Sequence, residues 1–190
     1  TRRVKRNSTG RDYDEQSLSE EFERCGLANQ LTDIVKRLLH PKDGKPRKGI
    51  LVFTQFIAEA EKLSREIDGV AVVTGSTPKK ERERILKAFK SGEIKVVSNV
   101  GVLTTGFDYP ELDTVVMARP TMSLAMWYQI VGRAIRPFPG KDGWIVDLGE
   151  NIKRFGKVED LELCVDKPGQ WYVRGVVGGY YKPLTNVYFQ

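Results

Sequence analysis

The sequence predicts an α/β domain built on a mainly parallel β-sheet that is covered by helices on both faces. Short, continuous apolar runs, typical of strands buried on both faces, recur between residues 50 and 147. Segments with apolar residues at helical spacing lie between most of these runs. The chain has 190 residues, of which 40% are hydrophobic, and this suffices for one soluble domain with an appended segment at one end.

The N-terminal residues 1–26 are predicted to be a connector from a preceding part of a longer chain. They begin without an initiator Met or an apolar signal core. The first 17 or so are polar and irregular, and a short helix is expected to begin at Ser17 or Ser19 and to run through Phe22. A longer helix is expected from about Asn29 to Leu39, where apolar residues recur at helical spacing.

The alternation of strands and helices begins at Gly49. The predicted strands are residues 50–54, 70–74, 95–98, 114–117 and 144–147. Helices are expected after Phe56, after Thr77 and Pro78, and after Pro120, where Ser123 is a candidate N-cap.

The pattern weakens beyond the last predicted strand. Asn151 to Phe155 are expected to form a short helix. Residues 168–190 are rich in Gly, Tyr and Val, which favours a strand pair or hairpin.

Composition sets limits on function. The formal charge of +6 and the pI of about 9.3 are compatible with a polyanionic partner but do not require one. Cys25 and Cys164 lie far apart, and together with the single His40 they make no plausible zinc site. Free thiols favour a reducing, cytoplasmic location. No apolar run approaches the roughly 20 residues that cross a bilayer.

Residues 129–137 hold two arginines in an otherwise apolar context. If Ser123 caps a helix, Gln129, Arg133 and Arg136 are spaced by four and three residues and share one face. Two guanidiniums on one face suit a site that grips a polyphosphate, because arginine offers forked donors to phosphate oxygens. The alternative is an ordinary solvated basic face.

Small or polar residues follow the predicted strands, in residues 54–56, 74–77, 98–101 and 118–121. Ligands of parallel sheets bind beyond the carboxyl ends of the strands, and hydroxyls and free amides at helix starts hold phosphates. The alternative is that these residues are only N-caps and turns. Asp108, after a Gly turn, could accept a hydrogen bond from a ribose hydroxyl or cap a turn.

The sequence lacks a GxxxxGK(S/T) phosphate loop and an acidic Mg²⁺ motif after a strand. The chain therefore lacks the parts that hold a triphosphate and its metal, and an arginine pair alone cannot hydrolyse ATP.

In order, residues 49–55, 74–77, 99–108 and 129–136 resemble motifs IV, IVa, V and VI of the second RecA-like lobe of superfamily 2 helicases and translocases. The run from Asn99 to Pro137, followed by Asp147, looks particularly like RadD-type bacterial repair helicases. Type I and III restriction motors and phage UvsW-like helicases are more distant relatives. The resemblance implies a three-layer α/β/α lobe over residues 27–160 and leaves 161–190 as an appendage of unknown role.

The resemblance also implies roles for residues near the nucleotide. Arg136 matches the arginine finger that reaches the γ-phosphate held by the other lobe, and Arg133 matches its partner arginine. Gln129 matches the residue that couples nucleotide state to closure. Gly106 and Asp108 match the end of motif V that faces the nucleotide.

A second group matches positions where such lobes touch the backbone of the tracking strand. These residues are Thr54, Gln55, Thr74, Gly75, Asn99 and Thr104. One departure is Val100, which stands where many relatives have Thr, so Ser98 or Asn99 is left to supply that contact. The zinc-binding cysteines that some RadD-like proteins carry downstream have no counterpart.

The implied function is that of the second motor lobe of an ATP-dependent DNA helicase or translocase, inactive as an ATPase alone. Its partners are then single-stranded DNA backbone and the first lobe of the same chain, which binds most of the ATP and Mg²⁺. The alternative is a nucleic-acid-binding or protein-docking module without a motor role. A small-molecule enzyme is disfavoured, because no nucleophile–base pair or metal cluster is visible and His40 lies in a helix-end turn.

Overall fold

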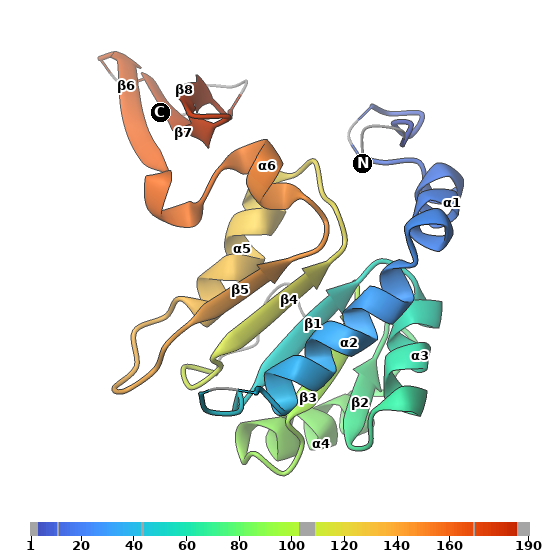
Figure 1. The fold of residues 1–190 in the computed structure, drawn as a ribbon. Coiled ribbons are helices and arrows are strands. Elements are labelled where there is room, and N and C mark those ends of the chain that lie inside the picture. Colours follow the sequence, from blue (N-terminus) through green and yellow to red (C-terminus); the bar gives the residue numbers. More distant parts are fainter. Residues whose placement is uncertain (1–3, 11, 43, 103–108, 169, 186–190) are drawn as a thin grey trace.

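Five parallel strands form the central sheet of the computed structural model, which describes residues 4–10, 12–42, 44–102, 109–168 and 170–185 (Figure 1). In chain order the strands are β1 (Ile50–Thr54), β2 (Val70–Val73), β3 (Val96–Val100), β4 (Thr114–Ala118) and β5 (Trp144–Asp147). Their order in the sheet is β2-β3-β1-β4-β5. All five coincide with predicted strands to within two residues at either end.

The central strand β1 pairs in parallel with both β3 and β4, so that Ile50 lies opposite Val96 on one side and Thr114 on the other. All five residues of β1 are buried. Continuous burial is what an apolar run without polar alternation requires, because both faces of the strand are covered.

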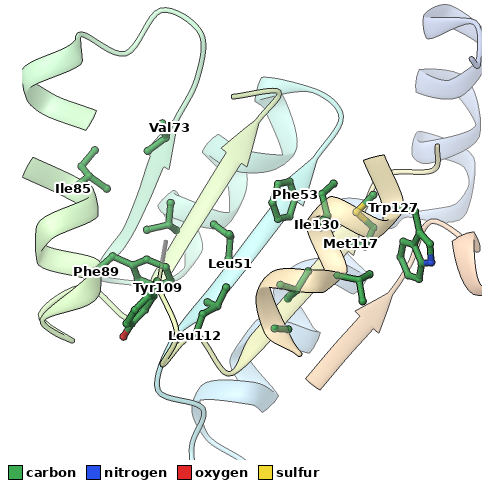
Figure 2. Packing of buried hydrophobic residues seen from close by; sticks show 14 of the residues in the cluster. Leu51, Phe53, Val73, Ile85, Phe89, Tyr109, Leu112, Met117, Trp127 and Ile130 are labelled. Carbon is green, nitrogen blue, oxygen red and sulfur yellow. The ribbon is translucent and has the colours of Figure 1, made fainter. Parts of the chain in front are cut away.

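Two helices cover each face of the sheet. The helices α2 (Leu27–Leu39) and α3 (Ile57–Glu66) pack on one face through a core that includes Ile50 and Val52. The helices α4 (Lys79–Lys90) and α5 (Leu124–Ala134) pack on the other through a core that includes Leu51 and Phe53 (Figure 2). The predicted three-layer α/β/α architecture is therefore confirmed.

The N-terminal residues do not match the prediction of an irregular stretch that continues to about residue 17. Helix α1 (Glu15–Cys25) begins earlier, because the Asp14 carboxylate accepts a hydrogen bond from the Ser17 amide at 2.9 Å. Tyr13, Leu18 and Phe22 are buried in a small core of their own. This core also takes in side chains from the connections after β1, β4 and β5, namely Phe56, Met122 and Leu148.

The C-terminal part forms a second, antiparallel sheet. Helix α6 (Asn151–Phe155) confirms the predicted helix, and the 3₁₀ turn η1 (Val158–Asp160) follows it. The second sheet contains β6 (Glu162–Lys167), β7 (Gln170–Val177) and β8 (Tyr180–Pro183), in that order. The hairpin of β7 and β8 was expected, whereas β6, with three charged residues among its six, was not. No helix in the described part of the chain is long and apolar enough to span a membrane.

Gly156 joins the two sheets at a point where no side chain fits. Its φ is 81°, and an added Cβ would lie 2.4 Å from the carbonyl oxygen of Val176 in β7. Gly140 has a similar φ of 70° but has open space around the same position.

We therefore predict that Gly156→Ala lowers the free energy of unfolding by about 2–4 kcal/mol, because backbone strain and a backbone clash add. Gly140→Ala, the matched control, should lower it by only about 1–2 kcal/mol, from left-handed strain alone. Urea unfolding of both variants measures the difference. If both variants lost the same free energy of unfolding, the close approach of Gly156 to β7 would add nothing to the strain of the left-handed backbone.

Candidate functional site

The connections that follow the five parallel strands lie at one end of the sheet, which we call the carboxyl edge. The register places Thr54 beside Val100 on one side and Ala118 on the other, so β1, β3 and β4 end level. Gln55, Gly101 and Arg119, the next residues of these three strands, therefore start the loops of this edge.

Two predicted nucleic-acid contacts lie inside the sheet rather than on its surface. Thr54 and Asn99 are fully buried. The Thr54 hydroxyl has no hydrogen-bond partner among the described residues, whereas the Asn99 side-chain oxygen accepts a hydrogen bond from the Val102 amide at 3.1 Å. Ser98, the alternative to Asn99, is equally buried. These side chains are thus buried below the surface of the carboxyl edge and do not face solvent.

The loop after β2 is closed by its own hydroxyls. The Thr74 amide donates to the Thr77 hydroxyl at 2.9 Å, and the hydroxyls of Thr74 and Ser76 lie 2.8 Å apart. Arg82 of α4 donates to the carbonyl oxygens of Thr74 and Thr77 at 3.5 and 3.3 Å. Gly75 and Ser76 are exposed at the tip of the loop. The hydroxyls of this loop are therefore used in turns and caps, as the alternative interpretation expects. The main chain at Gly75 and Ser76 is still exposed to a ligand.

The arginines lie at the opposite end of the sheet, the amino edge. Helix α5 starts after β4, where the Ser123 hydroxyl accepts a hydrogen bond from the Met126 amide at 3.2 Å and so confirms the predicted cap. The helix then returns along the sheet. A Cβ added to Gly143, which directly precedes β5, would lie 2.5 Å from the carbonyl oxygen of Ala134, the last residue of α5. The end of α5 is thus beside the start of β5.

Gln129, Arg133 and Arg136 do not share one helical face, and that prediction is wrong. Arg136 lies beyond the end of α5 and is exposed. The reason is Pro137, since a residue that precedes proline is disfavoured in helical conformation. Arg133 is inside the helix and only 7% exposed, whereas Gln129 is exposed.

The surroundings of Arg136 are open and positively charged. A cavity of about 600 Å³ is lined by Arg136, Phe138, Lys141 and neighbouring residues of the loop between α5 and β5. The Lys141 ammonium donates to the carbonyl oxygen of Pro110 at 2.9 Å. Burial lowers the pKa of Lys141; the negative charge of Asp113 opposes this effect, and the positive charge of Arg136 adds to it. Two cations that repel each other beside a cavity favour an anionic ligand.

A buried polar cluster connects the segments after β4 and β5 at the carboxyl edge. The Asn151 amide group donates to the carbonyl oxygen of Arg119 and to the Asp147 carboxylate, both at 2.9 Å. Its oxygen accepts from the Thr121 amide at 2.8 Å. The Asp147 carboxylate also accepts from the Gly149 and Ile152 amides. Burial raises the pKa of Asp147, and these hydrogen bonds oppose the rise.

Three predicted residues, Thr104, Gly106 and Asp108, lie outside the described residues. Sequence reasoning missed the role of Asn151 and gave Arg119 no role beyond its place in a loop. No sequence pattern links Asn151 to a loop thirty positions earlier, because its partners there are main-chain atoms. Within the described ranges no group of three or more His, Cys, Asp or Glu residues could hold a metal ion.

The five-stranded parallel sheet with helices on both faces defines a RecA-like lobe of the kind found at the C-terminal side of helicase motors. Residues 30–137 match the model of the helicase conserved C-terminal domain, which is more than half of the chain. The chain belongs to this family and is the second lobe of a superfamily 2 helicase.

Individual relatives agree with this assignment. The Saccharomyces cerevisiae protein named "Putative ATP-dependent helicase IRC3" is 32% identical over 139 residues, which cover 68% of this chain and 20% of that protein. The DNA 3'-5' helicase XPB of Kineococcus radiotolerans is 29% identical over 119 residues, 62% of this chain and 21% of that one. The chain thus spans about a fifth of these relatives. The C-terminal domain of the DEAD-box protein Dbp5 shares the fold, with a TM-score of 0.53 and 22% identity over 65% of this chain and 69% of that one.

The polar cluster leads to a prediction about stability. Asn151→Ala removes three hydrogen bonds and leaves buried main-chain groups of Arg119 and Thr121 without partners, so it should lower the free energy of unfolding by about 2–4 kcal/mol. The matched control is Lys153→Ala on the same helix, which loses only a surface pair with Glu150 and should cost less than about 1 kcal/mol. Thermal and urea unfolding measure both. A loss for Asn151→Ala no larger than that of the control would show that the cluster does not hold the two connections together.

Proposed function

We propose that this chain is the second motor lobe of an ATP-dependent DNA helicase or translocase, to which it supplies an arginine finger and contacts to the DNA backbone. The observation that supports this most directly is that the arginines and the polar loops lie at opposite edges of the sheet. The arginines lie at the amino edge, and the polar loops lie at the carboxyl edge of the same rigid sheet. A lobe of this kind can contact a nucleotide with one end and a strand with the other.

At the amino edge, Arg136 is the proposed arginine finger. It is exposed and borders an open cavity, so its guanidinium can reach a phosphate group held by another lobe. Arg133, buried and fixed in α5, is the proposed partner arginine. The resemblance adds Gln129 to the proposed nucleotide contacts, together with Gly106 and Asp108, which lie outside the described residues.

These residues fit only part of an ATP site. The printed sequence has no phosphate loop, so the first lobe is proposed to hold ATP and Mg²⁺, and bound ATP supplies the phosphoryl group that water attacks. Arg136 can stabilise the charge that develops on that group only when the two lobes close, which makes hydrolysis depend on conformation.

At the carboxyl edge, we propose that the DNA backbone rests on the loops after β1 and β2. Gln55, the exposed Gly75 and main-chain groups near Thr74 are the proposed contacts at this edge. The resemblance adds Thr104, which lies outside the described residues. Thr54 and Asn99 are buried, so their proposed contribution is to hold the loops in shape. Contacts to phosphates tolerate many sequences and weaken with salt.

The finer parts of the proposal rest on the resemblance to RadD-type helicases. They are the choice of DNA over RNA, a role in repair, and the division into a connector (1–26), a motor lobe (27–160) and an appendage (161–190). A cytoplasmic location is proposed from the two free thiols.

The arginine finger is tested in the full-length protein, which by this proposal contains both lobes. Arg136→Ala should lower DNA-stimulated ATP turnover about 10³-fold or more, while nucleotide binding is retained. Arg65→Ala, an exposed arginine in the last turn of α3, is the control and should keep turnover. Stimulation by DNA and not by RNA of the same sequence would support the choice of DNA. Unchanged turnover in Arg136→Ala would instead favour the docking-module alternative.

A second prediction concerns the 190-residue chain by itself. It should hydrolyse no ATP above background, with or without single-stranded DNA, because the groups that hold the triphosphate and its metal are absent from its sequence. A coupled phosphate-release assay measures this directly. DNA-dependent hydrolysis by this chain alone would contradict the assignment as a second lobe.

A further inference from the structure

Arg119 is a cation without an assigned role. It directly follows Ala118, the last residue of β4, and its side chain is half-buried. The Nε atom is buried and has no hydrogen-bond acceptor, and the guanidinium forms no ion pair with any residue that the structure describes. Burial lowers the pKa of Arg119, and the negative charge of the Asp12 carboxylate opposes this.

Arg47 shows what a structural arginine looks like in this protein. Its side chain is 12% exposed and donates to the Thr114 hydroxyl and to the carbonyl oxygen of Asp113 at 2.9 and 3.1 Å. It also pairs with the Asp113 carboxylate at 3.5 Å and lies over the Trp144 ring. A charge withdrawn from water normally acquires such partners, since burial without them is unfavourable. Arg119 lacks them.

The backbone of Arg119 is held firmly. Its carbonyl oxygen accepts the hydrogen bond from Asn151, and a Cβ added to Gly149 would lie 2.3 Å from that same oxygen. Pro120 and Thr121, which follow, are both buried. The guanidinium is therefore presented from a rigid support, as a binding residue requires.

The location of Arg119 in the fold indicates which kind of ligand it binds. Ala118 lies opposite Thr54 in the register of β1 and β4, so Arg119 starts its loop beside Gln55 at the carboxyl edge. The arginines of the proposed nucleotide side lie at the other edge. A strand backbone that rests on the carboxyl edge would bring phosphodiester groups to Arg119, and phosphate accepts the forked donors of arginine well.

We propose that Arg119 binds a backbone phosphate of the nucleic-acid strand at the carboxyl edge. This inference rests on the proposed function. Asp12, whose carboxylate accepts a hydrogen bond from the Tyr13 amide at 2.9 Å, is the acidic group that a phosphate at Arg119 would have to approach. Its negative charge should therefore weaken binding.

The test measures binding of a fluorescent oligo-dT strand by the full-length protein over a range of salt concentrations. Arg119→Gln should weaken binding about 5- to 10-fold at low salt and reduce the slope of log K against log salt by about 0.7, as expected for one lost phosphate contact on a single strand. Asp12→Asn should strengthen binding. The control Arg65→Gln, at the far end of α3, should change neither quantity.

Two further measurements separate a binding role from a structural one. Arg119 is a half-buried cation without a partner among the described residues, so Arg119→Gln should leave the unfolding midpoint unchanged or higher, whereas loss of a structural arginine would lower it. ATP affinity, measured without DNA, should be the same in Arg119→Gln and the wild type. A fall in ATP affinity with unchanged DNA binding would mean that Arg119 serves the nucleotide phosphates, and would overturn the inference.

Failure of this inference differs from failure of the proposed function. If the wild type binds oligo-dT with a clear salt dependence and Arg119→Gln keeps both the affinity and the slope, Arg119 does not bind the strand and the inference is overturned. The proposed function would then still stand. If the wild type itself does not bind nucleic acid, both are overturned.

Discussion

The parallel pairing of β1 with β3 and β4 is the constraint on which the rest of this lobe depends. A parallel pair needs a crossover connection, and the crossovers after β1, β2 and β4 contain the helices α3, α4 and α5, which cover the faces of the sheet. Because both faces are then buried, the strands must be continuously apolar, as the five buried residues of β1 are. The same pairing brings the ends of all the strands to one edge, so that loops distant in sequence become neighbours.

Helix α5 runs from that edge of the sheet to the opposite edge, and arginines lie at its far end. Its 11 residues rise about 16 Å at the usual 1.5 Å per residue, and the five residues of β4 extend about as far at 3.3 Å each. A helix that is capped at the carboxyl edge by Ser123 therefore ends level with the start of the sheet. Arg133 and Arg136 lie at that end for this geometric reason, and one rigid element joins the two edges.

The carboxyl edge is assembled from parts of the chain that meet only in the folded state. The Asp147–Asn151 cluster fixes the backbone from Arg119 to Thr121 by hydrogen bonds to main-chain groups. Tyr13 in the N-terminal segment accepts a hydrogen bond from Arg154 of α6 at 2.7 Å. Gly156 then allows the antiparallel sheet to pack against the end of α6. The N-terminal and C-terminal additions are thus both attached next to the proposed strand contacts.

The sequence by itself determined the layers, the five strands of the parallel sheet and the cap of α5, because apolar periodicity and the residues that start helices act locally. Tertiary structure alone decided which polar groups face outward. Thr54 and Asn99 are polar residues at or near the ends of apolar runs, yet both are buried in the sheet. Pro137 leaves Arg136 beyond the helix that contains Arg133. Strand β6 forms because it pairs with β7. The same is true of Arg119. That its guanidinium finds no partner among the described residues depends on all the segments packed around it, and no local sequence pattern records which neighbours a side chain will have.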